Sequence, residues 1–424
     1  MLAISPEPEN NEVNFTAAGG DETYTVTTNL PSWNVASDKE DWCKVAKTDD
    51  GTGFTVTAAP NRSADPMPDA KVTVSAEGAQ SVVLTVKQAG VDAALIFDDG
   101  TQAAAAYGKG DGTESSPYEI STAAELKKLV DEDMSKTAGV YYRLMADLKI
   151  AASEWKPIGY GSYPFLGDFD GNGHTVFGQI ISANQCCGFF GALDKNAVVR
   201  NLTVDAVVES KYTSPEGRTA AIVGFINGGS SSEPNHVKIL NCHAKGSVKG
   251  ASATSSSYTR LYAGGIVGAI WSNNAGSIEN CTNYASVTGG RGESTGNYAQ
   301  YSVGGIVGYM ASKNSATLSG CSNYGDVRGG SIVASNLTSS SVRTGGIIGV
   351  NENSYGLIHL CRNFGDVTSG DGQGRICSGV ISGTGNVFSC CSNAGTVDGL
   401  GEPDAAWVGF YGSVVDCPDG HTAQ

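Results

Sequence analysis

The stretch Gly264-Gly265-Ile266-Val267-Gly268 decides the fold, because it recurs along the chain. It returns as GGIVG at 304–308 and as GGIIG at 345–349, and degenerate copies begin at Ala220 and Ser378. Self-similarity at a nearly fixed period is the signature of a repeat architecture, in which each unit buries its apolar side against the next. The region that carries these copies is therefore expected to be a repeat protein.

A second motif alternates with the first and carries a cysteine. It reads Asn280-Cys281-Thr282-Asn283-Tyr284-Ala285-Ser286-Val287 and returns as GCSNYGDV at 320–327 and LCRNFGDV at 360–367. With two weaker copies included, five cysteines occupy the same place in successive repeats: Cys242, Cys281, Cys321, Cys361 and Cys391. Their spacings are 39, 40, 40 and 30 residues, and the shortest repeat keeps both motifs. The constant part is thus one turn of about 25 residues, and the remainder is a loop inserted at the same corner each time.

Short strands separated by Gly and Asn corners, with one apolar position above the next, are typical of a parallel β-helix. Strands of adjacent turns lie ~4.8 Å apart, so the five cysteines would stack into a buried ladder of thiols. Disulfide and zinc sites are the alternatives. A zinc site needs closely spaced cysteines with histidines nearby, which the long repeat period does not supply. We therefore predict a structural role for these cysteines, no metal site and no cofactor.

The start of the repeat region predicts a short helix. Thr122-Ala123-Ala124-Glu125 matches a capping box, in which Thr122 accepts the amide of Glu125 and the Glu125 side chain reaches back. Apolar residues then follow helical spacing up to Met134. Such a helix would cover the open end of the stacked strands, whose unpaired edge must be protected.

The residues before position 91 form a different pattern. Short alternating strands such as Tyr24-Thr25-Val26-Thr27-Thr28 and Val82-Val83-Leu84-Thr85-Val86 are separated by turn residues, at the strand spacing of a β-sandwich. Trp33 and Trp42 are expected to fill the core between its two sheets. Residues 91–109, which include a run of alanines, form the predicted linker to the repeats.

Charge and composition exclude several classes of function. The chain has 424 residues and a net charge of −16, whereas nucleic acids and anionic membranes are bound by basic surfaces. No run approaches the roughly 18 apolar residues of a membrane-spanning helix. Met1-Leu2-Ala3-Ile4 is followed by Ser5 and then by Pro, Glu and Asn, which is not the pattern of a signal peptide. A cytosolic protein and a protein whose leader has been removed both fit this start.

The first segment resembles a known family. Trp33-Asn34-Val35, Asp41-Trp42-Cys43-Lys44-Val45 and the ending Thr85-Val86-Lys87-Gln88-Ala89-Gly90 look like a BACON domain. This immunoglobulin-like module is common in secreted and surface proteins of Bacteroidetes-type bacteria, often beside carbohydrate-active domains. The resemblance covers residues 1–90 and implies a β-sandwich that binds carbohydrate or serves as a spacer.

The remainder resembles GLUG-motif proteins, which are bacterial surface proteins and adhesins. The resemblance rests on Gly110-Asp111-Gly112-Thr113-Glu114, on Trp155-Lys156-Pro157-Ile158-Gly159, on FLGDFDGNGHTV at 165–176 and on the GGIVG copies. Together the two resemblances imply an all-β chain: an immunoglobulin-like β-sandwich over 1–90, a linker over 91–109, and a right-handed parallel β-helix over 110–424 with a short capping helix. They also imply an extracellular position at the outer-membrane surface, reached with a lipoprotein leader.

Catalytic motifs are missing from the sequence. The GLUG family's peptidase relatives carry zinc on a separate domain, and this chain has no His-Glu-x-x-His motif. Asp168-Phe169-Asp170-Gly171-Asn172-Gly173 starts like a calcium loop, but Gln179 stands where that loop needs a bidentate glutamate. Acids are sparse in the regular repeats, whereas glycosidases need a carboxylate pair. We expect no enzyme, and the alternative is a carbohydrate-active β-helix enzyme, a lyase or glycosidase with a cryptic site.

The inserted corner loops are the positions most free to carry function. Among Ser, Thr and Asn they hold Tyr258, Arg260, Tyr262, Arg291, Tyr298 and Tyr301. Tyrosine beside short hydroxyl and amide side chains suits stacking on sugar rings, and plain solvated loops are the alternative. We predict a monomeric, non-enzymatic cell-surface protein for adhesion or glycan binding. Its partner would be a glycan or another extracellular component of a host or bacterial surface.

Overall fold

A computed structural model describes residues 1–296, 298–334, 340–352, 356–371, 376–381 and 391–398, and the backbone of 386–389 and 412–415. Contacts divide the chain into two compact units, Met1–Ile96 and Phe97–Gln424. The first is called here the N-terminal unit and the second the repeat unit. The prediction of an all-β fold with stacked parallel strands is confirmed for the described residues.

The N-terminal unit consists of two four-stranded sheets that enclose one core. The first sheet is antiparallel and has the order β1 (Leu2–Ser5), β3 (Gly20–Thr28), β6 (Gly53–Ala58) and β5 (Cys43–Lys47). The second has the order β2 (Glu12–Phe15), β8 (Val82–Gln88), β7 (Ala70–Ser75) and β4 (Asn34–Ser37), with β2 parallel to β8. Period-two alternation of Val and Thr directs one side chain in two inward, which is why these segments form half-buried strands.

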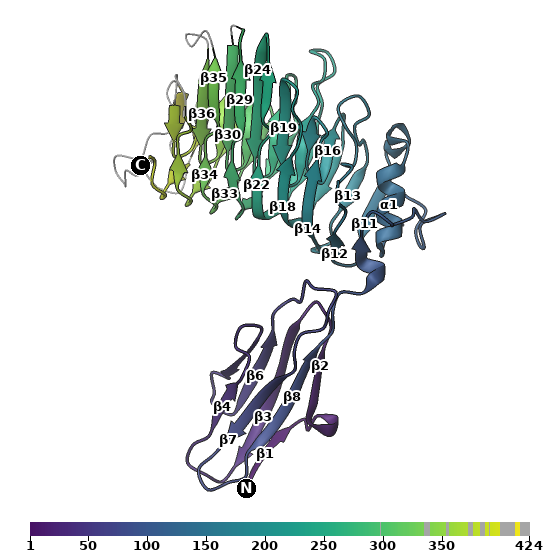
Figure 1. The fold of residues 1–424 in the computed structure, drawn as a ribbon, viewed down its shortest axis with the longest axis vertical. Coiled ribbons are helices and arrows are strands. Elements are labelled where there is room, and N and C mark those ends of the chain that lie inside the picture. Colours follow the sequence, from purple (N-terminus) through teal and green to yellow (C-terminus); the bar gives the residue numbers. More distant parts are fainter. Residues whose placement is uncertain are drawn as a thin grey trace. The chain divides into compact units, whose positions relative to one another are not determined.

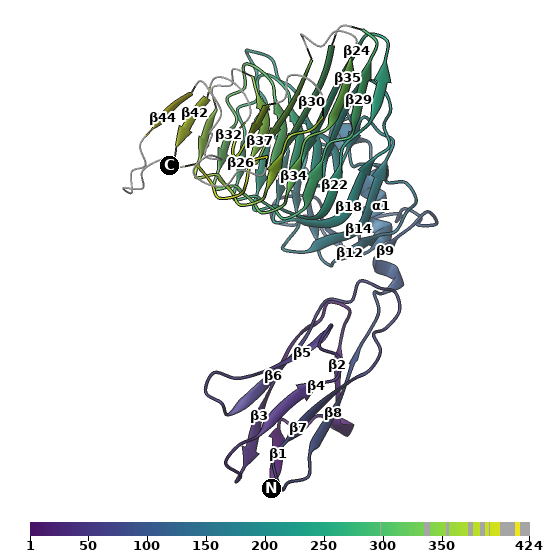
Figure 2. The same cartoon turned by 60° about the vertical axis from the view of Figure 1, so that its left-hand side comes forward.

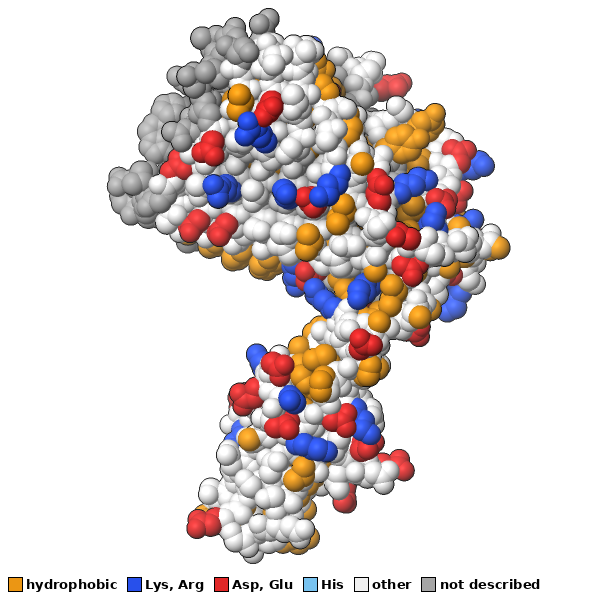
Figure 3. All heavy atoms as spheres, viewed as in Figure 1, with side chains coloured by type: hydrophobic (Ala, Val, Ile, Leu, Met, Phe, Trp, Pro, Cys, Tyr) orange, Lys and Arg blue, Asp and Glu red, His pale blue; other side chains and the backbone are white. Residues whose placement is uncertain are grey.

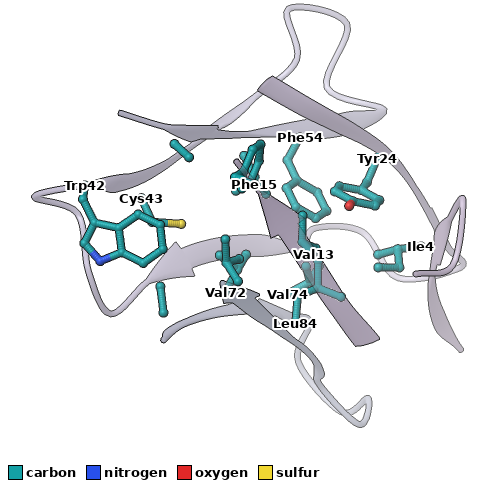
Figure 4. Packing of buried hydrophobic residues seen from close by; sticks show 14 residues of the cluster. Ile4, Val13, Phe15, Tyr24, Trp42, Cys43, Phe54, Val72, Val74 and Leu84 are labelled. Atoms are coloured by element: carbon teal, nitrogen blue, oxygen red, sulfur yellow. The ribbon is translucent and has the colours of Figure 1, made fainter. Parts of the chain in front are cut away.

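Aromatic side chains fill this core (Figure 4). Trp42 is buried there, and the ring of Tyr24 stacks on that of Phe54 with centroids 5.4 Å apart. Trp33 is only partly buried at the edge of the cluster, and the ammonium group of Lys47 lies 4.3 Å from its ring centroid. The expected core role therefore applies fully to Trp42 and in part to Trp33.

In the described part of the repeat unit, parallel strands form five sheets, and each circuit of the chain adds strands to several of them (Figures 1 and 2). The ten-strand sheet contains β10 (Tyr118–Ile120), β11 (Tyr141–Leu144), β13 (Asp168–Asp170), β17 (Val198–Arg200), β21 (Lys238–Leu240), β26 (Ser277–Glu279), β32 (Thr317–Ser319), β38 (Leu357–His359), β42 (Asn386–Ser389) and β44 (Gly412–Val415). The twelve-strand sheet contains β9 (Ile96–Phe97), β12 (Leu148–Ile150), β14 (Thr175–Ser182), β18 (Thr203–Ser210), β22 (His243–Lys249), β27 (Thr282–Asn283), β28 (Ser286–Thr288), β33 (Ser322–Asn323), β34 (Val327–Arg328), β39 (Arg362–Asn363), β40 (Val367–Thr368) and β43 (Ser392–Asn393).

The other three sheets carry the Gly-rich motif and the segments that follow the cysteine motif. The six-strand sheet contains β15 (Cys186–Cys187), β19 (Glu216–Ala220), β24 (Tyr258–Gly264), β30 (Tyr298–Gly304), β36 (Ser341–Gly345) and β41 (Ile376–Ser378). The five-strand sheet contains β16 (Phe190–Leu193), β20 (Val223–Ile226), β25 (Val267–Ile270), β31 (Val307–Met310) and β37 (Ile348–Asn351). The three-strand sheet contains β23 (Ala253–Ser255), β29 (Arg291–Ser294) and β35 (Ser331–Ala334).

The segments expected to be inserted loops are largely strands, so that prediction is wrong in its secondary structure. Residues 291–294 form β29, and Tyr298 begins β30, which pairs in register with β24 over its whole length. Sequence alone favoured loops because these segments vary in length between repeats and are rich in Ser and Gly. Pairing with identical strands on the neighbouring circuits outweighs that composition.

The predicted helix is present as α1 (Ala123–Asp131), which is shorter than expected and is followed by a 3-10 turn at Met134–Thr137. Thr122 Oγ1 accepts the amide of Glu125 at 3.3 Å. The carboxylate of Glu125 accepts from the amide of Ser121 at 2.8 Å, one residue before the N-cap. The helix lies beside β10, the first strand of the ten-strand sheet (Figure 1).

The predicted linker over 91–109 spans the boundary between the two units. From Phe97 onward it packs on the repeat unit, because Phe97 is buried with its ring 5.1 Å from that of Trp155. Tyr107 likewise stacks on Tyr118 with ring centroids 4.6 Å apart. Residues 97–109 therefore belong to the repeat unit.

Within the described residues, no helix has the length and apolar character needed to cross a membrane.

Candidate functional site

The six-strand and five-strand sheets meet at a sharp fold of the backbone. In three circuits the chain leaves one sheet at a Gly-Gly pair and enters the other three residues later, as from Gly264 to Val267, and Ala220 takes the place of Gly264 in the preceding circuit. A Cβ on Gly264 would lie 2.0 Å from the carbonyl oxygen of Val267, so a larger residue at this position would force the backbone to shift. The outward side chains of the two sheets therefore face each other and form a second, external hydrophobic cluster that includes Phe225, Tyr262 and Tyr309.

A pocket lies above this cluster, next to the small side chain of Ala311. Trp271, Ala311 and Glu352 each follow the last residue of a strand in the five-strand sheet and sit at the same level on successive circuits. The methyl group of Ala311 leaves space between the larger side chains on either side. The resulting pocket has a volume of about 250 Å³ and is lined by Arg260, Trp271, Ser272, Tyr298, Gln300, Tyr309, Ala311, Ser312 and Glu352.

The aromatic residues of the pocket are held rigidly. The ring of Tyr309 stacks on the buried ring of Tyr262 with centroids 4.5 Å apart, and its hydroxyl donates to the carboxylate of Glu352 at 2.8 Å. Burial, with the negative charge of Glu352, raises the pKa of Tyr309, so this hydroxyl keeps its proton. The guanidinium of Arg218 lies 5.4 Å from the ring of Trp271, a cation–π contact that fixes the indole.

Arg260 forms the charged end of the pocket. Its guanidinium lies between two tyrosine rings on adjacent strands, 5.2 Å from the centroid of Tyr258 and 5.4 Å from that of Tyr298. A guanidinium nitrogen of Arg260 is 3.6 Å from one carboxylate oxygen of Glu216, whose other oxygen is 3.3 Å from Arg218. The Arg260 side chain nevertheless stays 43% exposed. A single carboxylate is thus shared between two guanidinium groups, one of which faces the pocket.

The structure places the six residues predicted from the sequence in different surroundings. Arg260 and Tyr298 line the pocket, and Tyr258 lies exposed at its edge against Arg260. Tyr262 and Tyr301 are buried, so the expectation that they contact a ligand at the surface is wrong: Tyr262 lies under Tyr309, and the Tyr301 hydroxyl donates to the Ala251 carbonyl inside the stack at 2.7 Å. Their strands alternate, and in Tyr301 the alternation directs the ring inward.

Arg291 is exposed but lies apart from the pocket lining. It is on β29 in the three-strand sheet, where its side chain pairs with Glu293 on the same strand at 2.5 Å. This pair is a surface ion pair, and such pairs contribute little to stability.

Seven of the nine lining residues were not predicted from the sequence, among them Trp271, Tyr309 and Glu352. Two of them were recognisable in principle. Tyr309 follows Gly308 of one GGIVG copy directly, and Trp271 comes three residues after the preceding copy. Since a strand alternates its faces, outward positions after the motif point away from the inner core, and large aromatic residues there indicate a second packing surface.

The five repeated cysteines lie one above another inside the stack. All five are buried, and their thiols are unbridged. Each of the three central thiols donates to backbone carbonyls, as Cys281 does to Ile239 at 3.5 Å and to Glu279 at 3.4 Å. Burial raises the pKa of Cys281 well above its usual value. Among the described residues, no group of three or more His, Cys, Asp or Glu side chains is placed to hold a metal ion.

We expect the ladder thiols to resist modification in the folded protein. A thiol reacts as its thiolate, and burial both excludes the reagent and raises the pKa of Cys281. Native protein treated with a maleimide at pH 8 should leave Cys242, Cys281, Cys321, Cys361 and Cys391 unmodified by peptide mass spectrometry, whereas protein in denaturant should be modified at all five. Rapid modification of the five in native protein would contradict the buried ladder.

Next to the cysteines stands a ladder of buried asparagines. Nδ2 of each asparagine donates to Oδ1 of its counterpart on the next circuit, at 2.7 Å from Asn283 to Asn323, 2.7 Å from Asn323 to Asn363 and 2.6 Å from Asn363 to Asn393. The same Nδ2 also donates to a backbone carbonyl two residues on, as to Gly325 from Asn323 at 2.7 Å. The ladder saturates the amides and fixes the register of successive circuits.

An exposed aromatic column on the twelve-strand sheet is a weaker candidate for ligand binding. Tyr284, Tyr324 and Phe364 stack almost parallel, with centroids 5.1 Å and 4.6 Å apart. Each ring therefore covers the face of its neighbour, and mainly ring edges remain open. Figure 3 shows hydrophobic side chains along the lower edge of the repeat unit, with charged ones of both signs scattered over the visible face. The rings of the column stack on one another, whereas the pocket between the sheets brings aromatic rings together with Arg260, Gln300 and Glu352.

The calcium-like stretch has no free carboxylates. A guanidinium nitrogen of Arg200 hydrogen-bonds to Asp168, and Nε of Arg200 lies 3.4 Å from Asp170. Asp170 also accepts from the amide of Asn172 at 2.9 Å and from the side chain of Asn201 at 3.0 Å. Burial raises the pKa of Asp168 despite the arginine. These acids hold neighbouring circuits together.

Comparisons with known proteins give short matches. No family model matches the chain. Halomucin of Haloquadratum walsbyi is 37% identical over 149 residues, which are 31% of this chain and 2% of halomucin. A protein of Evansella cellulosilytica described as a Gly-rich membrane protein is 29% identical over 143 residues, which are 32% of this chain and 16% of that protein. The chain thus spans a small part of the length of these relatives.

A solved structure, Bacteroides ovatus GH5 xyloglucanase in complex with a XXXG heptasaccharide, matches at 20% identity over 38% of this chain and 37% of the other. Its TM-score of 0.18 is too low to support an argument about fold or activity.

Proposed function

We propose that this chain is a non-enzymatic cell-surface protein that binds a glycan in the pocket between the six-strand and five-strand sheets. The observation that carries the proposal is the composition of the pocket: Trp271, Tyr298 and Tyr309 beside Arg260, Gln300 and Glu352. A sugar ring has an apolar face and a rim of hydroxyl groups. Aromatic rings beside a few fixed polar groups complement both features.

The size of the pocket limits what it binds. Its volume of about 250 Å³ falls below the ~300–1,000 Å³ of drug-sized ligand sites. A single sugar ring at the end or along the side of a glycan therefore fits better than a buried stretch of polysaccharide. Binding by one such pocket is weak, and multivalent presentation of the glycan strengthens it.

The names of two relatives support a position at the cell surface, since one is halomucin and the other is described as a membrane protein. We further propose that the repeat unit is a right-handed parallel β-helix of the GLUG type, and that the N-terminal unit is an immunoglobulin-like BACON domain that acts as a spacer or an auxiliary sugar-binding module. The outer-membrane surface is the proposed location.

The distribution of carboxylates favours binding over catalysis. Glycoside hydrolysis commonly uses two carboxyl groups that flank the bond to be broken. Glu352 is the one carboxylate among the described residues that line the pocket. Glu216, the next carboxylate, lies behind Arg260 and is ion-paired to two arginines. Its charge is therefore engaged in holding the guanidinium groups.

The proposal is tested on a glycan array with the intact protein and three variants. Trp271→Ala removes an aromatic wall, and Ala311→Leu fills the space from which the pocket arises. Each is expected to reduce the array signal at least about tenfold, as for other aromatic contacts at binding centres. Tyr324→Ala, which removes an exposed ring from the aromatic column, is the matched control and should bind as the wild type does. Unchanged binding by both pocket variants, or release of sugar products by the wild type, would overturn the proposal.

A further inference from the structure

We propose that the sugar ring in this pocket carries a carboxylate, which Arg260 binds while the ring's hydroxyl groups donate to Glu352. This inference rests on the proposed function and names the class of its ligand. It follows from the placement of one guanidinium and one carboxylate around an aromatic floor. An acidic sugar has the same polarity, because its carboxylate and its free hydroxyls lie on different edges of the ring.

Arg260 is poised to take up an anion. Its contact with Glu216 is an ion pair at 3.6 Å, longer than a hydrogen bond, and the other oxygen of that carboxylate pairs with Arg218. The rings of Tyr258 and Tyr298 both contact the guanidinium, so little side-chain freedom is lost on binding. A planar guanidinium with open donors binds a carboxylate through two parallel hydrogen bonds.

Arg260 and Arg218 lie beside the same carboxylate, that of Glu216. Arg218 is almost fully buried, and within the described residues its Nε has no hydrogen-bond partner. Arg218 and Arg260 together face the single carboxylate of Glu216. The Glu216 side of the pocket thus has one positive charge more than it has negative charges, and the carboxylate of Glu352 lies elsewhere in the lining.

Glu352 sets the other end of the ligand. Its carboxylate already accepts from the Tyr309 hydroxyl at 2.8 Å, which fixes its position in the pocket. A carboxylate only accepts hydrogen bonds, so it complements sugar hydroxyls and repels a second anionic group. The acid group of the ligand is therefore directed to the Arg260 end, and neutral hydroxyls to the Glu352 end.

The experiment compares matched oligosaccharides that differ only in a carboxylate or a hydroxymethyl group at C6, in the gluco, galacto and manno series. Isothermal titration with the intact protein should give at least about tenfold tighter binding of one acidic member than of its neutral partner. Arg260→Gln should abolish that preference, because it should lower the affinity for the acidic sugar more than the affinity for its neutral partner. Glu352→Gln should increase the preference for the acidic sugar, because it removes a negative charge from the pocket. Arg291→Gln, which makes the same charge change outside the pocket, should leave the preference unchanged.

The outcomes separate this inference from the proposed function. Equal binding of the acidic and neutral sugars by the wild type would overturn the acidic ligand and leave glycan binding intact. An acidic preference that persists in Arg260→Gln, with a thermal transition like that of the wild type, would also overturn it. A glycan array without any signal would instead overturn the proposed function itself.

Discussion

Replacement of Gly305 by alanine is expected to prevent the repeat unit from folding cooperatively. The added Cβ would lie 2.1 Å from the carbonyl oxygen of Gly346 on the next circuit and 2.4 Å from Cγ of Asn323. Neither neighbour can retreat, because Gly346 belongs to a paired circuit and Asn323 is held in the buried ladder. The cost should exceed the ~1–3 kcal/mol that is typical of overpacking in a core.

Far-ultraviolet circular dichroism and urea unfolding of the full chain would measure this loss. The matched control is Gly161→Ala, because the nearest atom to its added Cβ is 4.0 Å away on the side chain of Gln185. This control should keep the wild-type unfolding curve within about 0.5 kcal/mol, as for most surface substitutions. Unfolding curves that agree between Gly305→Ala and Gly161→Ala would contradict the packing of the glycine column on the asparagine ladder.

The asparagine ladder is expected to have the second largest effect. Asn323→Ala removes two donated hydrogen bonds, to Gly325 and Asn363, and the bond accepted from Asn283. Each lost bond leaves an unsatisfied polar partner inside the stack at a cost of ~1–3 kcal/mol, so the free energy of unfolding should fall by about 3–9 kcal/mol. Ser322→Ala on the same strand, whose side chain points to the other face, should change it by less than about 0.5 kcal/mol. Equal urea midpoints for the two variants would contradict the ladder.

Asn323→Asp adds a test by pH. The new carboxyl group would face two acceptors, the Gly325 carbonyl and Asn363 Oδ1, in a fully buried site. Its pKa in the folded state is therefore raised above the ~3.9 of an unfolded aspartate. A group with a raised pKa in the folded state binds its proton more tightly there, so its destabilising effect is smallest near pH 4 and grows as the pH rises. The gap in urea midpoint between variant and wild type should be larger at pH 7 than at pH 4.

Periodicity in the sequence was enough to predict the stacked parallel strands and the column of cysteines. It was not enough to separate strand from loop at Arg291–Ser294, because that segment forms a strand only through its partners on neighbouring circuits. The buried position of Asn323 was also missed. A polar side chain inside a core is unfavourable unless its hydrogen bonds are satisfied, as they are here by the asparagines above and below, and a list of motifs does not show which motif packs on which.

The pocket could be predicted only in part. Arg260 and Tyr298 were found because aromatic and basic residues recur in the segment after the cysteine motif. Trp271 and Glu352 reach the same pocket from the opposite sheet, and the backbone folds at Gly264 and at Gly345 bring them there. Tyr262 and Tyr301 look equivalent to Tyr298 in sequence, yet one lies under the second cluster and the other points into the stack.

The asparagine ladder also has a consequence for how such a gene can change. Its steps measure 2.7, 2.7 and 2.6 Å although 40, 40 and 30 residues separate the members. The hydrogen bond between two asparagines therefore does not depend on how many residues separate them, provided that the chain returns to the same place in the next circuit. Deletions or insertions of about a strand's length on the outer side, and duplications of an entire circuit, keep the inner frame intact. The outer surface of the repeat unit can thus change in length and sequence by genetic rearrangement while the buried asparagine ladder stays the same.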